Sequence, residues 1–261
     1  MLTIGSLFSG IGGLELGLEW AGLGPVRWQV ERDEFCRRVL AKHWPGVRRY
    51  DDVRTVGAGL ERVDVICGGF PCQDVSSAGS RAGLSGSRSG LWREFARIVS
   101  ATSPSWVVVE NVASGATRWV DAVVRDLAER GYAALPIPLS GAAVGAPHKR
   151  ARVFVVARHV DGEGQPIVPL HAEVGGPPSS ASDLDRDDLR DEPGRGSGAR
   201  GASAQEPERP SWRLPEPDMV RVVHGVPRGV DRVGARIRAL GNSVIPQCAQ
   251  VIGHVIRELT T

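Results

Sequence analysis

Residues 3–21 read TIGSLFSGIGGLELGLEWA, a short apolar run followed by a glycine-rich turn and then by apolar residues at helical spacing. The run 3–8 predicts a β-strand, and residues 14–21 predict a helix that begins directly after the turn. Glycines in such a turn let backbone amides approach a bound ligand, and the helix N-terminus adds positive potential. A purely structural tight turn has the same sequence, so this stretch alone predicts a strand–turn–helix unit.

The same alternation continues to about residue 159. Further strands are expected at 26–30, 63–67, 106–110, 133–139 and 152–157, and further helices at 34–43, 91–101 and 120–130. The strands are nearly continuous in apolar residues, as in a parallel sheet that is covered on both faces. Gly22 and Gly131 follow two of the helices and are typical helix ends. We therefore expect an α/β fold with a doubly wound, mostly parallel sheet.

The composition changes after residue 159. Residues 160–216 are dominated by Gly, Pro, Ser, Asp, Glu and Arg, a composition that buries too little apolar surface to offset its ordering entropy. Apolar residues return near Trp212 and in 219–224, and residues 245–259 predict a C-terminal helix starting near Pro246. The expected organisation is a domain at 1–159, a largely irregular region or linker at 160–216, and a C-terminal segment at 217–261.

Bulk properties set limits on function and location. The 261 residues carry a net charge of +2, which does not by itself indicate a polyanionic partner. No apolar run is long enough for a membrane helix and the N-terminus does not resemble a signal peptide, so we expect a cytoplasmic protein. Cys36, Cys67, Cys72 and Cys248 form no CxxC pair. They predict reduced thiols and no metal site.

Acidic residues follow the glycine-rich turn at the spacing of a nucleotide site. Glu31 ends the second predicted strand about 20 residues on, where doubly wound folds place a carboxylate for ribose hydroxyls. Asp52 is a further candidate, suited to an adenine amino group, although an acid there is more often a cap or turn residue. Leu14 replaces the last glycine of GxGxxG, so the dinucleotide pattern is incomplete. An adenosine-containing ligand is expected, and these residues do not distinguish which one.

Reactive side chains follow the next two strands. Cys72 lies in a loop beyond the strand at 63–67, where a thiolate could act as a nucleophile, whereas the other three cysteines suit buried positions. Glu110 emerges from the neighbouring strand, either as an acid or as an ordinary cap or ion-pair residue. Arg150 and Arg152 precede or begin the strand at 152–157, and alternation predicts that both point toward the same pocket. An ordinary basic strand edge would look alike.

Together these residues resemble the ordered motifs of the DNA (cytosine-5)-methyltransferase family. The resemblance covers about residues 2–159 and 217–258, and its most specific part is the pairing of PCQ with ENV. The matching segments are Phe8-x-Gly10-x-Gly12, Glu31, Asp52, Gly69-Phe70-Pro71-Cys72-Gln73, Glu110-Asn111-Val112, Arg150-x-Arg152 and Gly241-Asn242-Ser243-Val244-Ile245-Pro246.

This resemblance implies a Rossmann-like methyltransferase that uses S-adenosylmethionine and acts on a cytosine flipped out of double-stranded DNA. Cys72 would add to C6 of the base, and Glu110 would hold N3 and the exocyclic amine. Arg152 would contact the cytosine carbonyl, and Arg150 the active-site loop or a phosphate. Implied DNA contacts are Gln73, Ser76, Arg81 and Arg88. The implied contacts to S-adenosylmethionine are Phe8, Gly10, Ile11, Gly12, Glu31, Asp52, Val53, Pro71, Leu91, Asn242 and Ser243.

The resemblance also implies that the C-terminal helix returns to pack beside the first strand. It further implies a monomer, with a cognate restriction endonuclease as a candidate partner. The region 160–216 stands where the family carries a target-recognition domain, and its shortness predicts either a very short recognition sequence or ordering upon DNA binding. His148 stands where the family commonly has Gln.

Two alternatives remain. A tRNA cytosine-5 methyltransferase shares the motif order, although Gln73 argues against it. A catalytically silent nucleic-acid-binding relative is the other, although the presence of Cys72, Glu110 and Arg152 argues against decay.

Overall fold

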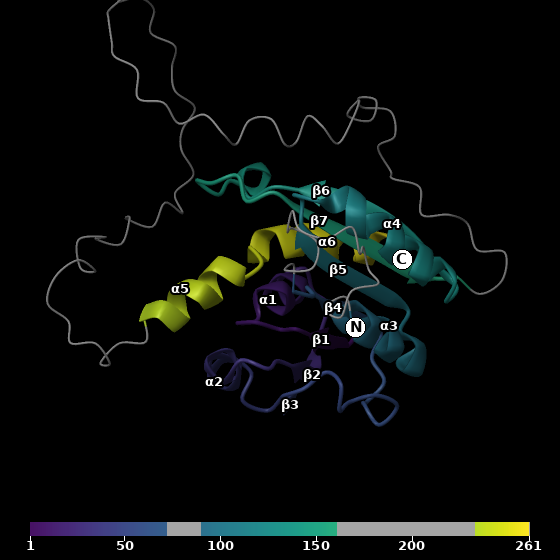
Figure 1. Cartoon of the computed structure of the whole chain (residues 1–261), viewed down its shortest axis with the longest axis horizontal. Helices are drawn as coiled ribbons and strands as arrows, with labels where there is room; N and C mark the ends of the chain where they lie inside the picture. The colour runs from purple at the N-terminus through teal and green to yellow at the C-terminus, as the bar shows by residue number, and fades with distance from the viewer. Residues whose placement is uncertain (72–89, 161–232, 261) are drawn as a thin grey trace, which may run out of the picture.

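The computed structural model describes residues 1–71, 90–160 and 233–260, and seven strands in this part form one sheet (Figure 1). Their order across the sheet is β3-β2-β1-β4-β5-β7-β6. The strands are β1 (Ile4–Leu7), β2 (Val26–Val30), β3 (Arg48–Tyr50), β4 (Val65–Gly68), β5 (Trp106–Val112), β6 (Tyr132–Leu139) and β7 (Arg152–His159). The helices are α1 (Gly13–Trp20), α2 (Glu34–His43), α3 (Gly90–Thr102), α4 (Ala116–Ala128), α5 (Val233–Asn242) and α6 (Pro246–Glu258), with a 3-10 turn at Ala142–Val144.

The sheet is doubly wound and mostly parallel, as predicted. β3, β2, β1, β4 and β5 run parallel, whereas β7 runs antiparallel to both β5 and β6. From β1 the chain winds outward through β2 in one direction and through β4 in the other. The carboxyl ends of β1 and β4 therefore flank the point where such folds place ligands.

Apolar side chains form one core on each face of the sheet. One core packs α3 and α4 against the sheet through residues such as Trp92, Phe95 and Trp119. The other packs α1 and α6 through residues such as Leu18 and Ile252. Both faces are thus covered by helices, which explains why the strands are nearly continuous in apolar residues.

The C-terminal helix α6 packs directly on α1, whereas the resemblance implied a place beside the first strand. A Cβ atom added to Gly17 of α1 would lie 2.1 Å from the carbonyl oxygen of Pro246 and 2.5 Å from Cβ of Ala249. Glycine at this position therefore lets α6 lie directly on α1. α5, which precedes α6, extends away from the body of the molecule (yellow, Figure 1).

Two elements were not predicted from the sequence. β3 is only three residues long and includes Arg48 and Arg49, so it lacks an apolar run. α5 contains Gly234 and Gly241, which are poor helix formers. The predicted ends at Gly22 and Gly131 are confirmed, because these residues have φ of 84° and 81°.

The described residues include three of the four cysteines. Cys36, Cys67 and Cys248 are free and buried, as expected. No helix in the described ranges is both long and apolar enough to span a membrane. The predicted irregular region 160–216 and the apolar stretch at 219–224 lie almost wholly outside the described residues.

Candidate active site

The glycine-rich turn between β1 and α1 has a left-handed backbone that glycine adopts without strain. Gly10 and Gly12 have φ of 56° and 88°, and Phe8 shares this left-handed region with φ of 54°. A Cβ on Gly12 would lie 2.4 Å from the ring of Trp44, whereas a Cβ on Gly10 would meet nothing within 4 Å. The turn is thus tightly packed behind Gly12 and open in front of Gly10.

Glu31 ties this turn to the end of β2. Its Oε2 accepts a hydrogen bond of 2.7 Å from the Gly10 amide, and its Oε1 accepts one of 2.7 Å from the Asp33 amide. Burial raises the pKa of Glu31, and the two amides oppose that rise. Each oxygen keeps a lone pair, so the carboxylate is held in place and can still accept a further hydrogen bond.

A cavity of about 440 Å³ lies at the carboxyl edge of the parallel strands. It joins the turn and Glu31 at one end to Glu110 and Arg152 at the other. The sequence-predicted residues that line it are Phe8, Gly10, Glu31, Asp52, Val53, Pro71, Leu91, Glu110, Arg152 and Asn242. The structure therefore brings together most of the expected nucleotide-binding positions and two of the expected reactive ones.

Other predicted residues line a second, adjacent cavity. Ile11, Gly12, Ser243 and Arg150 border this space of about 330 Å³, which lies between α1 and the segment leading into α6. Gly13 borders it as well, and a Cβ there would lie 2.4 Å from the Val244 carbonyl oxygen. These residues form a wall between the turn and the C-terminal segment instead of lining the larger cavity.

Glu110 and Arg152 form a largely buried ion pair. Arg152 Nε lies 2.8 Å from Glu110 Oε1, and the two side chains are only 18% and 11% exposed. Burial raises the pKa of Glu110, while the positive charges of Arg152 and Arg150 oppose the rise. Glu110 is therefore a carboxyl group held close to a guanidinium at the wall of a cavity, where burial and the positive charges act on its pKa in opposite directions.

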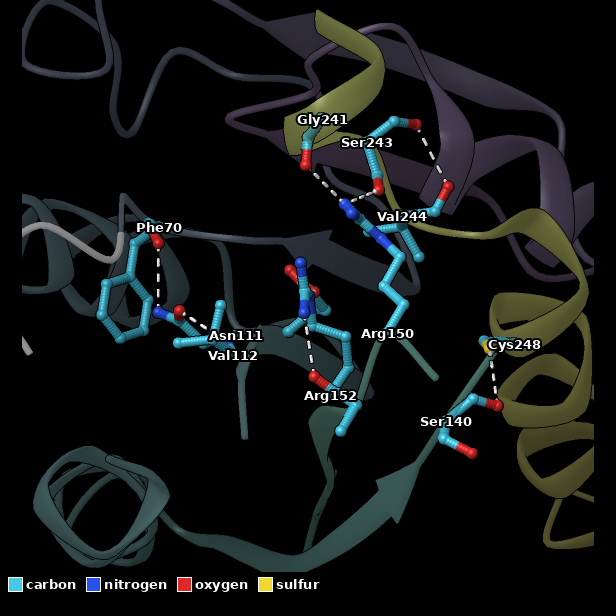
Figure 2. A network of polar contacts seen from close by, with 12 residues as sticks. Phe70, Asn111, Val112, Ser140, Arg150, Arg152, Gly241, Ser243, Val244 and Cys248 are labelled. Atoms are coloured by element: carbon cyan, nitrogen blue, oxygen red, sulfur yellow. Dashed lines mark hydrogen bonds and ion pairs between the residues drawn. The ribbon is translucent and has the colours of Figure 1, made fainter. Parts of the chain in front are cut away.

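Neighbouring contacts fix the backbone segment that leads to Cys72. Asn111 Nδ2 donates a hydrogen bond of 3.1 Å to the Phe70 carbonyl oxygen (Figure 2). The Phe70 ring packs against Trp92 and Trp119 with centroid distances of 5.7 and 6.0 Å. A Cβ on Gly69 would lie 2.7 Å from Glu110 Oε2. Residues 69–71 are thus held against β5 and next to Glu110.

The prediction that Arg150 and Arg152 point into one pocket was wrong. Arg150 donates hydrogen bonds to the carbonyl oxygens of Gly241, at 2.8 Å, and Ser243 (Figure 2). Arg150 lies before β7 with φ of 36°, so the alternation of a strand does not extend to it. Its guanidinium holds the segment before α6, whereas that of Arg152 faces Glu110.

Some predicted residues lie outside the described part of the chain: Cys72, Gln73, Ser76, Arg81 and Arg88. Conversely, the sequence did not single out Asp33 and Arg238, which line the larger cavity. Asp33 is also the N-cap of α2, where its side chain accepts a hydrogen bond from the Cys36 amide. Arg238 belongs to the unpredicted helix α5, so no sequence signal placed it near the cavity.

A family model and related proteins match this chain. A family model described as C-5 cytosine-specific DNA methylase matches residues 2–186. Type II methyltransferase M2.BsuMI of Bacillus subtilis is 35% identical over 167 residues, which are 60% of this chain and 42% of that protein. M.AquIA of Picosynechococcus is 31% identical over 203 residues, which are 69% of this chain and 79% of that protein. The chain spans less than half the length of M2.BsuMI.

Solved structures agree with the fold. A protein described as a DNA modification methyltransferase of an Escherichia coli prophage is 29% identical, with a TM-score of 0.52 over 61% of this chain and 47% of that one. The Entamoeba histolytica methyltransferase EhMeth has a TM-score of 0.55 at 19% identity, covering 63% of this chain and 55% of that one. This second likeness concerns the fold alone.

Proposed function

Because this chain belongs to the C-5 cytosine-specific DNA methylase family, we propose that it transfers the methyl group of S-adenosylmethionine to C5 of a cytosine in double-stranded DNA. The observation that carries the proposal is the shared cavity. Glu31 and the glycine-rich turn border it at one end, and the Glu110–Arg152 pair borders it at the other, beside the segment that leads to Cys72.

The residues present fit S-adenosylmethionine. The fixed Glu31 carboxylate suits ribose hydroxyls, and Asp52 suits the adenine amino group. Val53 and Leu91 add apolar surface for the adenine ring. The missing Cβ at Gly10 leaves room for close approach of the ligand to the backbone. When bound, S-adenosylmethionine supplies an electrophilic methyl group on its sulfonium.

Cys72 and Glu110 would activate the cytosine, which must be flipped out of the duplex because C6 lies inside the base stack. The Cys72 thiolate forms a bond to C6, and the electron pair of the C5–C6 double bond becomes available at C5. Glu110, whose pKa is raised by burial, holds a proton at N3 and so stabilises the adduct. After methylation, loss of the C5 proton and of Cys72 restores the aromatic ring and frees the thiolate.

Arg152 would act on both the base and Glu110. Its Nε binds the Glu110 carboxylate and its Nη1 donates to the Ala151 carbonyl oxygen, which leaves Nη2 to donate toward the cytosine carbonyl oxygen. Arg150 would act at a distance, by holding Gly241 and Ser243 so that Asn242 remains at the cavity wall.

The proposal extends to a partner and to a location. The relatives are named Type II methyltransferases, which makes a cognate restriction endonuclease a reasonable partner to test. Monomeric action in the cytoplasm, and DNA contacts by Gln73, Ser76, Arg81 and Arg88, remain predictions from the sequence.

Tritiated methyl transfer tests this function. Unmethylated duplex DNA and tRNA are offered to the wild-type protein, to Cys72→Ala and Glu110→Gln, and to Cys248→Ala, a buried cysteine of α6, as the matched control. DNA labelling is expected with the wild type and with Cys248→Ala, and no labelling with Cys72→Ala. Glu110→Gln is expected to reduce the labelling rate by about 100-fold or more. Labelling that survives Cys72→Ala would overturn the mechanism. Labelling of tRNA alone would identify a tRNA enzyme, and no labelling at all would favour the silent relative.

A further inference from the structure

A row of polar side chains crosses the middle of the sheet beneath α1. Ser6 of β1 is the register partner of Gln29 on β2 and of Cys67 on β4. All three are buried, although the surrounding positions on this face are apolar. Glu15 of α1 is also fully buried, and Ser6 and Gln29 lie close enough to its carboxyl group to influence its pKa.

Glu15 and Gln29 are the unusual members of this row. Within the described residues, neither carboxyl oxygen of Glu15 and neither amide atom of Gln29 has a hydrogen-bond partner. Buried polar groups without partners cost about 1–3 kcal/mol each, so such groups nearly always pair. The Ser9 and Ser6 hydroxyls do pair, at 2.9 Å.

The chemistry of the two unpaired groups is complementary when Glu15 is neutral. A protonated carboxyl has one donor and one acceptor, and a primary amide offers the matching acceptor and donor. An ionised carboxylate can still accept a hydrogen bond from the Gln29 amide N–H, but it has no donor for the Gln29 carbonyl oxygen. Protonation of Glu15 therefore decides whether both hydrogen bonds of this buried pair can form.

The surroundings place that protonation near neutral pH. Burial raises the pKa of Glu15 to about 7, while the nearby polar side chains of Ser6, Ser9 and Gln29 partly oppose the rise. The titratable group that faces Glu15 from β4 is the Cys67 thiol, whose pKa burial holds well above its ordinary value. The groups from β1 and β2 do not titrate, so near pH 7 Glu15 is the member of this row that changes charge.

The row supports the glycine-rich turn. Ser9 lies between Phe8 and Gly10, both of which line the larger cavity. Its amide donates to the Val30 carbonyl oxygen at 3.2 Å, and its hydroxyl binds Ser6. Glu15 therefore lies behind the same turn that Glu31 holds from the front.

We propose that Glu15 is a positioning residue for the methyl donor: as a neutral acid it pairs with Gln29 and, with Ser6 and Ser9, holds the turn 8–13 in its binding conformation. Ionisation of Glu15 removes the hydrogen bond that the acid donates to Gln29, loosens the turn and weakens binding. The proposal rests on the proposed function, because it assumes that the cavity takes an adenosine compound.

Calorimetric binding of S-adenosylhomocysteine between pH 6 and pH 8.5 tests it. If the neutral form alone binds, affinity falls by up to about tenfold from pH 6 to pH 8 in the wild type. Glu15→Gln, which is permanently neutral, is expected to bind at every pH about as well as the wild type does at pH 6. Glu19→Gln on the same helix is the matched control and should keep the wild-type pH dependence.

Two further measurements separate positioning from simple structural support. The double variant Glu15→Gln with Gln29→Glu exchanges acid and amide and should restore a pH-dependent affinity. Without ligand, the NMR shifts of the Gly10 and Gly12 amides should titrate near pH 7 in the wild type and not in Glu15→Gln. Wild-type affinity that does not change with pH, or a pH dependence that survives Glu15→Gln, would overturn the role of Glu15. No binding at any pH would instead contradict the proposed function.

Discussion

Glu110 is a buried carboxyl group whose charge is balanced mainly by the guanidinium of Arg152, 2.8 Å away. Taking one partner from a buried pair leaves the other charged and poorly solvated, which typically costs 3–5 kcal/mol. The pair is not fully enclosed, so we expect a cost at the lower end of this range.

Arg152→Ala should therefore lower the free energy of unfolding by about 3 kcal/mol at pH 8, as measured by urea denaturation. Without Arg152 the pKa of Glu110 rises further above its ordinary value, so the penalty falls as the pH is lowered and Glu110 takes up a proton. The loss at pH 5 should be clearly smaller than at pH 8. Arg158→Ala, which removes a guanidinium stacked over Trp106, serves as control and should cost less than about 1 kcal/mol. A loss independent of pH would contradict this view of Glu110.

Glu15 has its own signature in stability. Its pKa is raised from 4.5 to about 7 in the folded protein, so its contribution is fully present below pH 4.5 and is lost as the pH rises through 7. The loss amounts to about 3 kcal/mol, since one pKa unit corresponds to about 1.4 kcal/mol. The stability of Glu15→Gln relative to the wild type should thus rise by about 3 kcal/mol between pH 4.5 and pH 8, as followed by urea denaturation at each pH. A constant difference would mean that Glu15 titrates normally.

For single residues, the sequence predicted which residues border the cavity better than it predicted where their side chains point. Glu31, Glu110 and Arg152 line one cavity as expected. Arg150 does not, because one residue with positive φ ends the alternation on which the prediction depended. The buried Glu15 was missed because a Glu in an amphipathic helix is ordinarily exposed, and only the register of three strands shows what lies beneath it.

The packing of α6 on α1 depends on the absence of a side chain at Gly17. Gly17 lies so close to Pro246 and Ala249 that no larger residue fits without moving α6. Elements with long apolar runs were predicted well. β3 was not, because its pairing with β2 and not its own sequence defines it. α5 was not, because it contains Gly234 and Gly241, which are poor helix formers.

Gly17→Ala should lower the free energy of unfolding by about 1–3 kcal/mol, because the added methyl group overpacks the contact between α1 and α6. The measurement is thermal or urea unfolding. Gly234→Ala in α5 is the matched control: a Cβ there meets nothing within 4 Å, and Ala favours helix by up to about 1 kcal/mol. Equal effects of the two substitutions would contradict the close approach of α6.

For the whole molecule, Arg150 connects segments that are more than 90 residues apart. Its guanidinium binds the carbonyl oxygens of Gly241 and Ser243, on either side of Asn242. The family resemblance implied that the C-terminal segment returns to the site formed by the N-terminal motifs. The division of that site into two adjacent cavities depends on the contact between α1 and the segment before α6, which no local pattern reveals.

Arg150→Ala should weaken binding of S-adenosylhomocysteine by about tenfold, since a lost charged hydrogen bond is worth roughly 1.5–3 kcal/mol. Isothermal titration calorimetry measures this. The neighbouring Lys149→Ala removes an exposed positive charge of the same sign and should leave affinity unchanged within about twofold. Similar losses in both variants would show that net charge, and not the fixing of residues 241–243, governs binding.

The antiparallel direction of β7 also limits how short the connection between β7 and α5 can be. β7 ends at His159, beside Ser105 at the amino edge of the parallel strands, whereas α5 borders the cavity at their carboxyl edge. The connection from residue 160 to residue 233 is therefore anchored at opposite rims of the sheet. An eight-residue strand spans about 26 Å, so a deletion that leaves fewer than about eight linking residues could not close the fold. A module grafted into this connection would therefore join the amino edge of the sheet to the cavity wall through α5.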